Sequence, residues 1–106
     1  MIYLNSFVDS SSPFFIAQVI GNSMLPTLHN NDLVLIMRAE EYALGDIVVV
    51  STLEKQYIIH RIIKKINKNS KQLYLTKGDN ISNIDRWYTI QNIHGKVVSL
   101  LESKQI

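Results

Sequence analysis

The chain has 106 residues, of which 46% are hydrophobic, and its 11 Lys and Arg against 9 Asp and Glu give a formal net charge of +2. This length predicts a single domain over residues 1–106, with one core and no room for a second independent domain. The small charge argues against an electrostatic nucleic-acid binder, so no nucleic-acid partner is expected. Because there is no Cys, a disulfide framework, a thiolate metal site and a thiol nucleophile are excluded.

Metal sites and membrane spans are not expected either. The three His, at positions 29, 60 and 94, lack the regular spacing of a structural zinc site, so we predict no metal and no cofactor. The longest apolar runs, 14–17 and 47–50, are far shorter than the roughly 20 residues that cross a bilayer. Polar residues interrupt the N-terminal segment, which therefore lacks the long apolar centre of a secretory signal. We therefore predict a soluble, cytoplasmic protein, and the hydrophobic start, with Phe7 and Phe14, leaves peripheral membrane contact open.

Short runs of β-branched residues, separated by turn-forming residues, predict strands along most of the chain. The segment 39–44 fits one helical turn at most, and 53–55 is short enough for a hairpin connection. The expected fold class is all-β, with one curled or closed and mostly antiparallel sheet. The predicted strands are Phe14–Ile20, Asp32–Met37, Asp46–Thr52, Gln56–Ile66, Gln72–Thr76 and roughly Gly95–Leu101.

Ser23 lies in a segment that does not fit a plain β-strand. The first strand stops at Gly21, Ser23 follows, and Pro26 pushes the residue before it away from helical backbone angles. Such a turn presents a hydroxyl and free backbone N–H groups on one side, as a nucleophile that attacks a carbonyl requires. An ordinary Gly-Asn-Ser turn is the alternative.

His60 is the second exception, because strand alternation places it on one face with Ile58 and Ile62, while Arg61 lies on the other face. A titratable ring among isoleucines is partly desolvated and suits a general base. The alternative is a half-buried His whose nitrogens bond to the backbone. Arg61 is expected to pair with a carboxylate such as Asp46.

The third exception is the loop 76–86, which carries Asp79 and Asp85. A solvated, Asx-rich loop is one interpretation. The other is that a Ser, a His and an Asp from separate elements assemble a hydrolytic triad, for which chain order is not diagnostic.

Four segments together resemble the type I signal peptidases. Gly-Asn-Ser-Met-Leu-Pro-Thr at 21–27 resembles the nucleophile box of that family, and the segment 44–50 resembles the Gly-Asp-Ile/Val-Val strand that follows it. His-Arg-Ile-Ile at 60–63 resembles the base-bearing strand, and Lys-Gly-Asp-Asn at 77–80 matches a further box. A His at the base position, where most bacterial members and the LexA-type autoproteases have Lys, resembles the archaeal and endoplasmic-reticulum type.

The resemblance implies a Ser-His-Asp mechanism and a sheet of the LexA and signal peptidase type. Ser23 would be the nucleophile, His60 the general base and Asp85 the group that orients the imidazole, with Lys77 as an alternative base. The implied supporting positions are Asp79, Gly21 and Asn22, and the implied substrate-binding positions are Met24 and Pro26.

Two departures from the family pattern stand out. Only 22 residues precede Ser23, where family enzymes carry a membrane anchor. Gly21 replaces a Ser whose hydroxyl often assists the oxyanion, and losing one such donor costs about 100-fold or more in rate.

The resemblance therefore implies a serine endopeptidase that removes a leader or signal segment through an acyl-enzyme. Its peptide or protein substrate would bind as an extended strand and could be delivered by a partner protein. The alternative is a catalytically silent relative that binds peptides or a partner. A self-cleaving LexA-like regulator fits less well, because the base is not Lys and neither a DNA-binding domain nor an Ala-Gly cleavage segment precedes Ser23.

Overall fold

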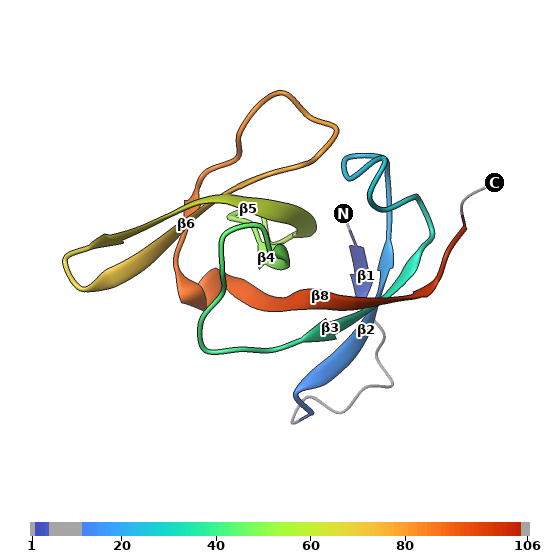
Figure 1. The fold of residues 1–106 in the computed structure, drawn as a ribbon, viewed down its shortest axis with the longest axis horizontal. Coiled ribbons are helices and arrows are strands. Elements are labelled where there is room, and N and C mark those ends of the chain that lie inside the picture. Colours follow the sequence, from blue (N-terminus) through green and yellow to red (C-terminus); the bar gives the residue numbers. More distant parts are fainter. Residues whose placement is uncertain (1, 5–11, 105–106) are drawn as a thin grey trace.

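A computed structural model describes residues 2–4 and 12–104, which form eight strands and one 3₁₀ helix in a single sheet (Figure 1). The all-β prediction is confirmed. The elements are β1 (Ile2–Leu4), β2 (Phe14–Val19), β3 (Leu33–Met37), β4 (Ile47–Ser51), β5 (Tyr57–Lys68), β6 (Lys71–Lys77), β7 (Trp87–Tyr88), η1 (Ile90–Asn92) and β8 (Ile93–Glu102).

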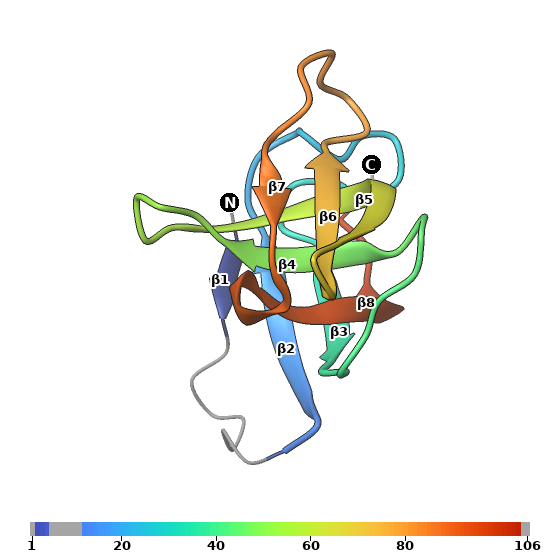
Figure 2. The same ribbon diagram turned by 90° about the vertical axis from the view of Figure 1, so that its left-hand side faces the viewer.

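The sheet is strongly curled rather than closed. Its strand order is β1-β2-β3-β8-β4-β5-β6-β7, and all neighbouring strands are antiparallel. In Figure 2, β4, β5 and β8 run across the direction of β2 and β3, so the two halves of the sheet face each other. Within the described residues the two end strands, β1 and β7, do not pair, so the closed alternative is not what forms.

The six predicted strands form with ends that differ by at most two residues from the expected ones. The sequence did not predict β1 and β7, because strands of three and two residues carry too little alternation to be recognised. The segment 39–44, which was expected to form one helical turn at most, forms no helix. There the backbone N–H of Tyr42 donates to the Tyr74 hydroxyl at 3.4 Å, and Lys65 Nζ donates to the Tyr42 carbonyl at 2.9 Å, so tertiary contacts replace helical ones.

Two apolar cores lie on the two faces of β4. Successive side chains of a strand point to opposite faces, and accordingly Val49 packs in the first core while Val48 and Val50 pack in the second. All three are fully buried, which explains the unbroken apolar run in this strand. Val48 is also the register partner of His60, so the strand that carries this His is held against the buried centre of the sheet.

The loops that carry the polar motifs project from one end of the molecule. The segment after β2 and the loop 78–86 after β6 lie close together in both views (Figures 1 and 2), and the Asn80 N–H donates to the Ser23 carbonyl at 2.8 Å. This contact brings together segments that are distant in sequence.

Of the hydrophobic start, Phe15 packs in the first core and Phe14 is 40% exposed, whereas Phe7 lies outside the described residues. None of the helices in the described part of the chain has the length and apolar character needed to cross a membrane.

Candidate active site

Ser23 lies in a tight turn that begins directly after β2. Gly21 has a φ of 96°, a left-handed conformation that favours glycine, and its N–H donates to Asn30 Oδ1 at 2.8 Å. A helix-like bond from the Leu28 N–H to the Met24 carbonyl, 2.9 Å long, closes the next part of the turn. The Ser23 side chain is left half-buried at the end of the sheet, facing β5 and the loop after β6.

Three polar side chains from separate elements form one hydrogen-bonded chain. His60 Nε2 lies 3.2 Å from Ser23 Oγ, and His60 Nδ1 lies 2.6 Å from Asp85 Oδ2. A carboxylate oxygen accepts, so Nδ1 carries the proton and Nε2 is free to accept the Ser23 hydroxyl proton. His60 is 6% exposed, which shields the imidazole from bulk water. This tautomer is the one that a general base toward Ser23 requires.

Thr76 is a member of this arrangement that the sequence analysis missed. Its hydroxyl donates to Asp85 Oδ2 at 2.7 Å, the same oxygen that faces His60, and the Asp85 N–H donates to the Thr76 carbonyl at 2.8 Å. Thr76 is fully buried. Two donors on one oxygen, together with the backbone bond, fix the direction of the carboxylate. A Thr directly before the Lys-Gly-Asp-Asn box is the sequence signal that could have identified it.

Asp79 does not join the chain of Ser23, His60 and Asp85, and instead fastens the loop that carries Asp85. It accepts two hydrogen bonds from Arg61, from Nε at 2.9 Å and from Nη2 at 2.8 Å, and a third from the Thr27 hydroxyl at 2.6 Å. Arg61 Nη1 also donates to the Gly45 carbonyl at 2.8 Å. Asp79 thereby links the loop after β6 to β5 and to the Ser23 turn.

The expected pairing of Arg61 with Asp46 is wrong. Asp46 accepts the Ala43 N–H at 2.8 Å and lies 3.9 Å from Lys96, while Arg61 pairs with Asp79. A bidentate Arg–carboxylate contact has better geometry than any single-point contact. The loop after β6 folds back toward β5 and places Asp79 where it makes this contact with Arg61.

Gly78 allows the loop to approach the His60 ring. A Cβ added at this buried position would lie 2.8 Å from the Ser23 carbonyl oxygen and 3.0 Å from His60 Nε2. Neither distance leaves room for a side chain, so glycine is required here by close approach. The neighbouring Lys77, the alternative base, directs its ammonium to the Gly78 carbonyl at 3.0 Å.

The remaining predicted positions lie around the Ser23 turn. Asn22 is exposed, and its carbonyl accepts from Asn80 Nδ2 at 3.1 Å. Pro26 is exposed, whereas Met24 is 1% exposed and packs in the first core. Met24 therefore supports the turn from beneath and does not present a surface to a ligand.

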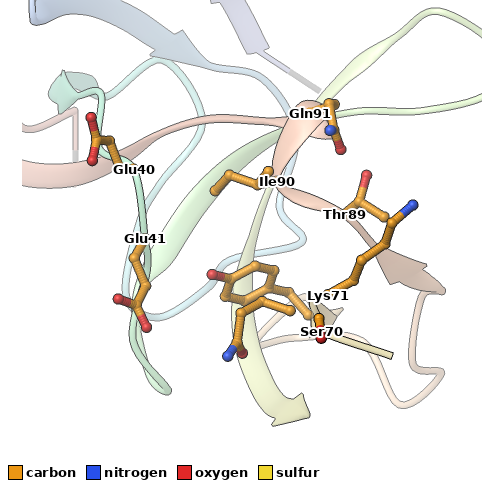
Figure 3. Close-up of a pocket in the computed structure, with 9 residues that line it drawn as sticks. Glu40, Glu41, Ser70, Lys71, Thr89, Ile90 and Gln91 are labelled. Atoms are coloured by element: carbon orange, nitrogen blue, oxygen red, sulfur yellow. The ribbon is translucent and has the colours of Figure 1, made fainter. Parts of the chain in front are cut away.

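Two pockets in the described part of the chain differ in how they lie relative to this site. A pocket of about 390 Å³ opens at the other end of the second core, between Glu40, Glu41, Lys71, Tyr74 and Gln91 (Figure 3), and includes no residue of the Ser23, His60 and Asp85 chain. A second pocket, of about 380 Å³, is lined by Asp85 and Arg86 and reaches the hydrogen-bonded chain from the Asp85 side. Within residues 2–4 and 12–104, no three His, Cys, Asp or Glu side chains are grouped to hold a metal ion.

The acid stability of the protein should depend on Asp79. Hydrogen bonds from the Arg61 guanidinium and then from Thr27 lower the pKa of this carboxyl below its ordinary value of 3.8. A carboxyl whose pKa is lowered by folding stabilises the folded state above its unfolded pKa, and this stabilisation is lost as pH falls through the lower, folded value. We expect Asp79→Asn to be less stable than wild type at neutral pH, and the difference to shrink below a pH of about 3.8.

Urea unfolding at several pH values measures this difference. Glu54→Gln, which removes an exposed carboxylate from the turn between β4 and β5, is the matched control. A stability difference between wild type and Asp79→Asn that stays constant down to a pH of about 2 would contradict the expectation.

A curled β-sheet that joins a Ser, a His and an Asp from three elements has the arrangement of a serine hydrolase. The Peptidase S24-like family matches residues 1–98, and the chain belongs to this family.

Relatives with a named role support the same assignment. The chain is 36% identical over 84 residues to the signal peptidase complex catalytic subunit SEC11 of Metarhizium acridum (strain CQMa 102). The matched region covers 76% of this chain and 49% of that protein. It is 37% identical over 79 residues to the subunit of the same name from Candida tropicalis (strain ATCC MYA-3404 / T1). This match covers 73% of this chain and 46% of that protein. The resemblance to signal peptidases is thus confirmed. The chain spans about half the length of these curated relatives, and no solved structure is significantly similar to it.

Proposed function

We propose that this chain is a serine endopeptidase that removes a leader or signal segment from peptide or protein substrates. The observation that carries the proposal is the continuous hydrogen-bonded chain from Ser23 Oγ through His60 to Asp85. Membership of a peptidase family and similarity to catalytic subunits of signal peptidase complexes support it. In this proposal residues 1–106 make up one catalytic domain.

The first chemical step is acylation of Ser23. His60 Nε2 removes the hydroxyl proton as Oγ attacks the scissile carbonyl, and the imidazolium that forms is stabilised by the Asp85 carboxylate. The Ser23 backbone N–H donates to the developing oxyanion. When the tetrahedral intermediate collapses, the C–N bond breaks and His60 returns the proton to the leaving amine. The product is an ester on Ser23 and a released C-terminal fragment.

The second step is hydrolysis of this ester. His60 removes a proton from a water molecule as it attacks the acyl carbon, and then protonates Ser23 Oγ as the C–O bond breaks. The N-terminal fragment leaves as a carboxylic acid. Thr76 and Asp85 hold the ring in one orientation through both steps, so the same nitrogen acts as base and then as acid.

A partner protein forms part of the proposal. The relatives named above are described as subunits of a signal peptidase complex. We therefore propose that this chain also works with a partner that delivers its substrate.

A silent relative that binds peptides without cleaving them is the second candidate. Gly21 favours it, because a glycine two positions before Ser23 supplies no side-chain donor to an oxyanion. The hydrogen-bonded chain of three side chains favours the enzyme.

Mass spectrometry after rapid acid quenching separates the two candidates. The protein is mixed with synthetic leader peptides that carry an apolar segment followed by Ala. We expect two product fragments and a transient increase in protein mass, equal to the mass of the N-terminal fragment minus one water and located on Ser23. Peptides that bind but yield neither fragments nor adduct would overturn the enzyme proposal and support the silent relative.

A further inference from the structure

The outer edge of β2, the strand that leads to Ser23, is covered by the N-terminal strand of the same chain. β1 pairs with β2 in antiparallel register, with Ile2 opposite Val19, Tyr3 opposite Gln18 and Leu4 opposite Ala17. The other side of β2 pairs with β3. An external strand that approached β2 would therefore find its backbone groups already paired with β1.

β1 also comes close to β5, the strand that carries His60. β4 pairs with one edge of β5 over residues 57–61, and β6 pairs with the other edge from Arg61 onward. Among the described strands, none pairs with that second edge over residues 57–60. β1 contacts both β2 and β5, and it lies between them in the view of Figure 1.

This position leads directly to the hydrogen-bonded chain of Ser23 and His60. Val19 ends β2 four residues before Ser23, and Ile2 is its register partner, so the N-terminal end of β1 points toward the Ser23 turn. An extended peptide bound between β2 and β5 would run toward the Ser23 hydroxyl. Addition of a strand to an open sheet edge is a general mode of peptide recognition.

We propose that β1 is an autoinhibitory strand, which occupies the edge of β2 where an extended peptide substrate binds and is displaced when that substrate enters. The inference rests on the proposed function, since it takes substrate access to Ser23 as the step that β1 controls. β1 has three residues, and so short a strand is displaced at small free-energy cost. It therefore weakens substrate binding without blocking cleavage, because apparent affinity falls by the fraction of molecules in the open form.

Removing the β1 pairing should lower KM and leave kcat unchanged. We expect deletion of residues 1–4, or Tyr3→Pro, to lower KM about tenfold, as for an open form populated at roughly one part in ten. Tyr3→Thr keeps the backbone donor and the strand preference, and serves as the matched control with wild-type KM. Equal KM values for wild type, the deletion and Tyr3→Pro would overturn the inference.

A reversible lock tests the same strand without deleting it. The chain has no Cys, so Tyr3→Cys with Gln18→Cys places the sole pair of thiols at directly opposite register positions. We expect the oxidised form to bind a leader peptide at least about tenfold more weakly than the reduced form. Gln18→Cys alone should respond to neither oxidant nor reductant.

Peptide binding, measured in a Ser23→Ala background, keeps this test separate from cleavage. Absence of cleavage in every variant, with peptide affinity that still depends on the lock, would reject the endopeptidase and retain the autoinhibitory strand. Cleavage that is equal in the oxidised and reduced forms would reject the strand and retain the endopeptidase. Failure of the disulfide to form would contradict the position of β1 and also reject the inference.

Discussion

Replacing Ser23 with Ala should lower kcat/KM by on the order of 10⁴-fold or more, because the acyl-enzyme requires the hydroxyl oxygen. His60→Ala should have a similar effect, since the hydroxyl, whose hydrogen bond to Nε2 is 3.2 Å long, would have no base to receive its proton. The two groups act in one step, so the double variant should lose no more activity than either single variant.

Initial rates of leader-peptide cleavage measure these losses. Ser82→Ala, in the exposed part of the loop after β6, is the matched control and should cleave at the wild-type rate. Ser23→Ala should still bind the peptide, because main-chain pairing with the sheet edge does not involve the hydroxyl. Cleavage by Ser23→Ala within tenfold of the wild-type rate would end the serine mechanism.

The strands could be predicted because local patterns determine them. The apolar run at Val48–Val50 and the alternation around His60 each follow from burial of one or both faces of a strand, which the sequence displays directly. The turn at Asn69 and Ser70, both with positive φ, lies inside the polar stretch that separates two predicted strands.

Hydrogen-bond and ion-pair partners that are distant in sequence could not be predicted. From the sequence, Arg61 is expected to pair with a carboxylate such as Asp46, whereas its pairing with Asp79 depends on how the loop after β6 returns to β5. The Thr76 hydroxyl bond to Asp85 likewise depends on the conformation of that loop.

β1 could not be predicted either, for a local reason. Three residues are too few to show an alternating pattern, so neither this strand nor its register with β2 is visible in the sequence. Resemblance to a family identified the three polar positions, whereas side-chain geometry was needed to find the residues that orient them.

Asp85→Asn should lower kcat by on the order of 10⁴-fold at neutral pH with little change in stability. An Asn amide directed at His60 donates where the carboxylate accepts, so the imidazole would carry its proton on Nε2 and could not accept the Ser23 proton. The Thr76 hydroxyl donates to the same Asp85 Oδ2 that faces His60. A hydroxyl can also accept, so with the Asn NH₂ group in the place of Oδ2 its two N–H groups can donate to His60 Nδ1 and to the Thr76 hydroxyl.

The matched comparison is Asp79→Asn, which makes the same chemical change in the same loop. Asp79 bonds to Arg61 and Thr27, and its replacement should lower kcat far less than that of Asp85. Single-turnover cleavage of a leader peptide at neutral pH separates the two, because it reports acylation alone. A larger loss in Asp79→Asn than in Asp85→Asn would assign the orientation of the imidazole to the ion pair with Arg61. The bond of 2.6 Å between Asp85 and His60 would then be a structural contact without a role in proton transfer.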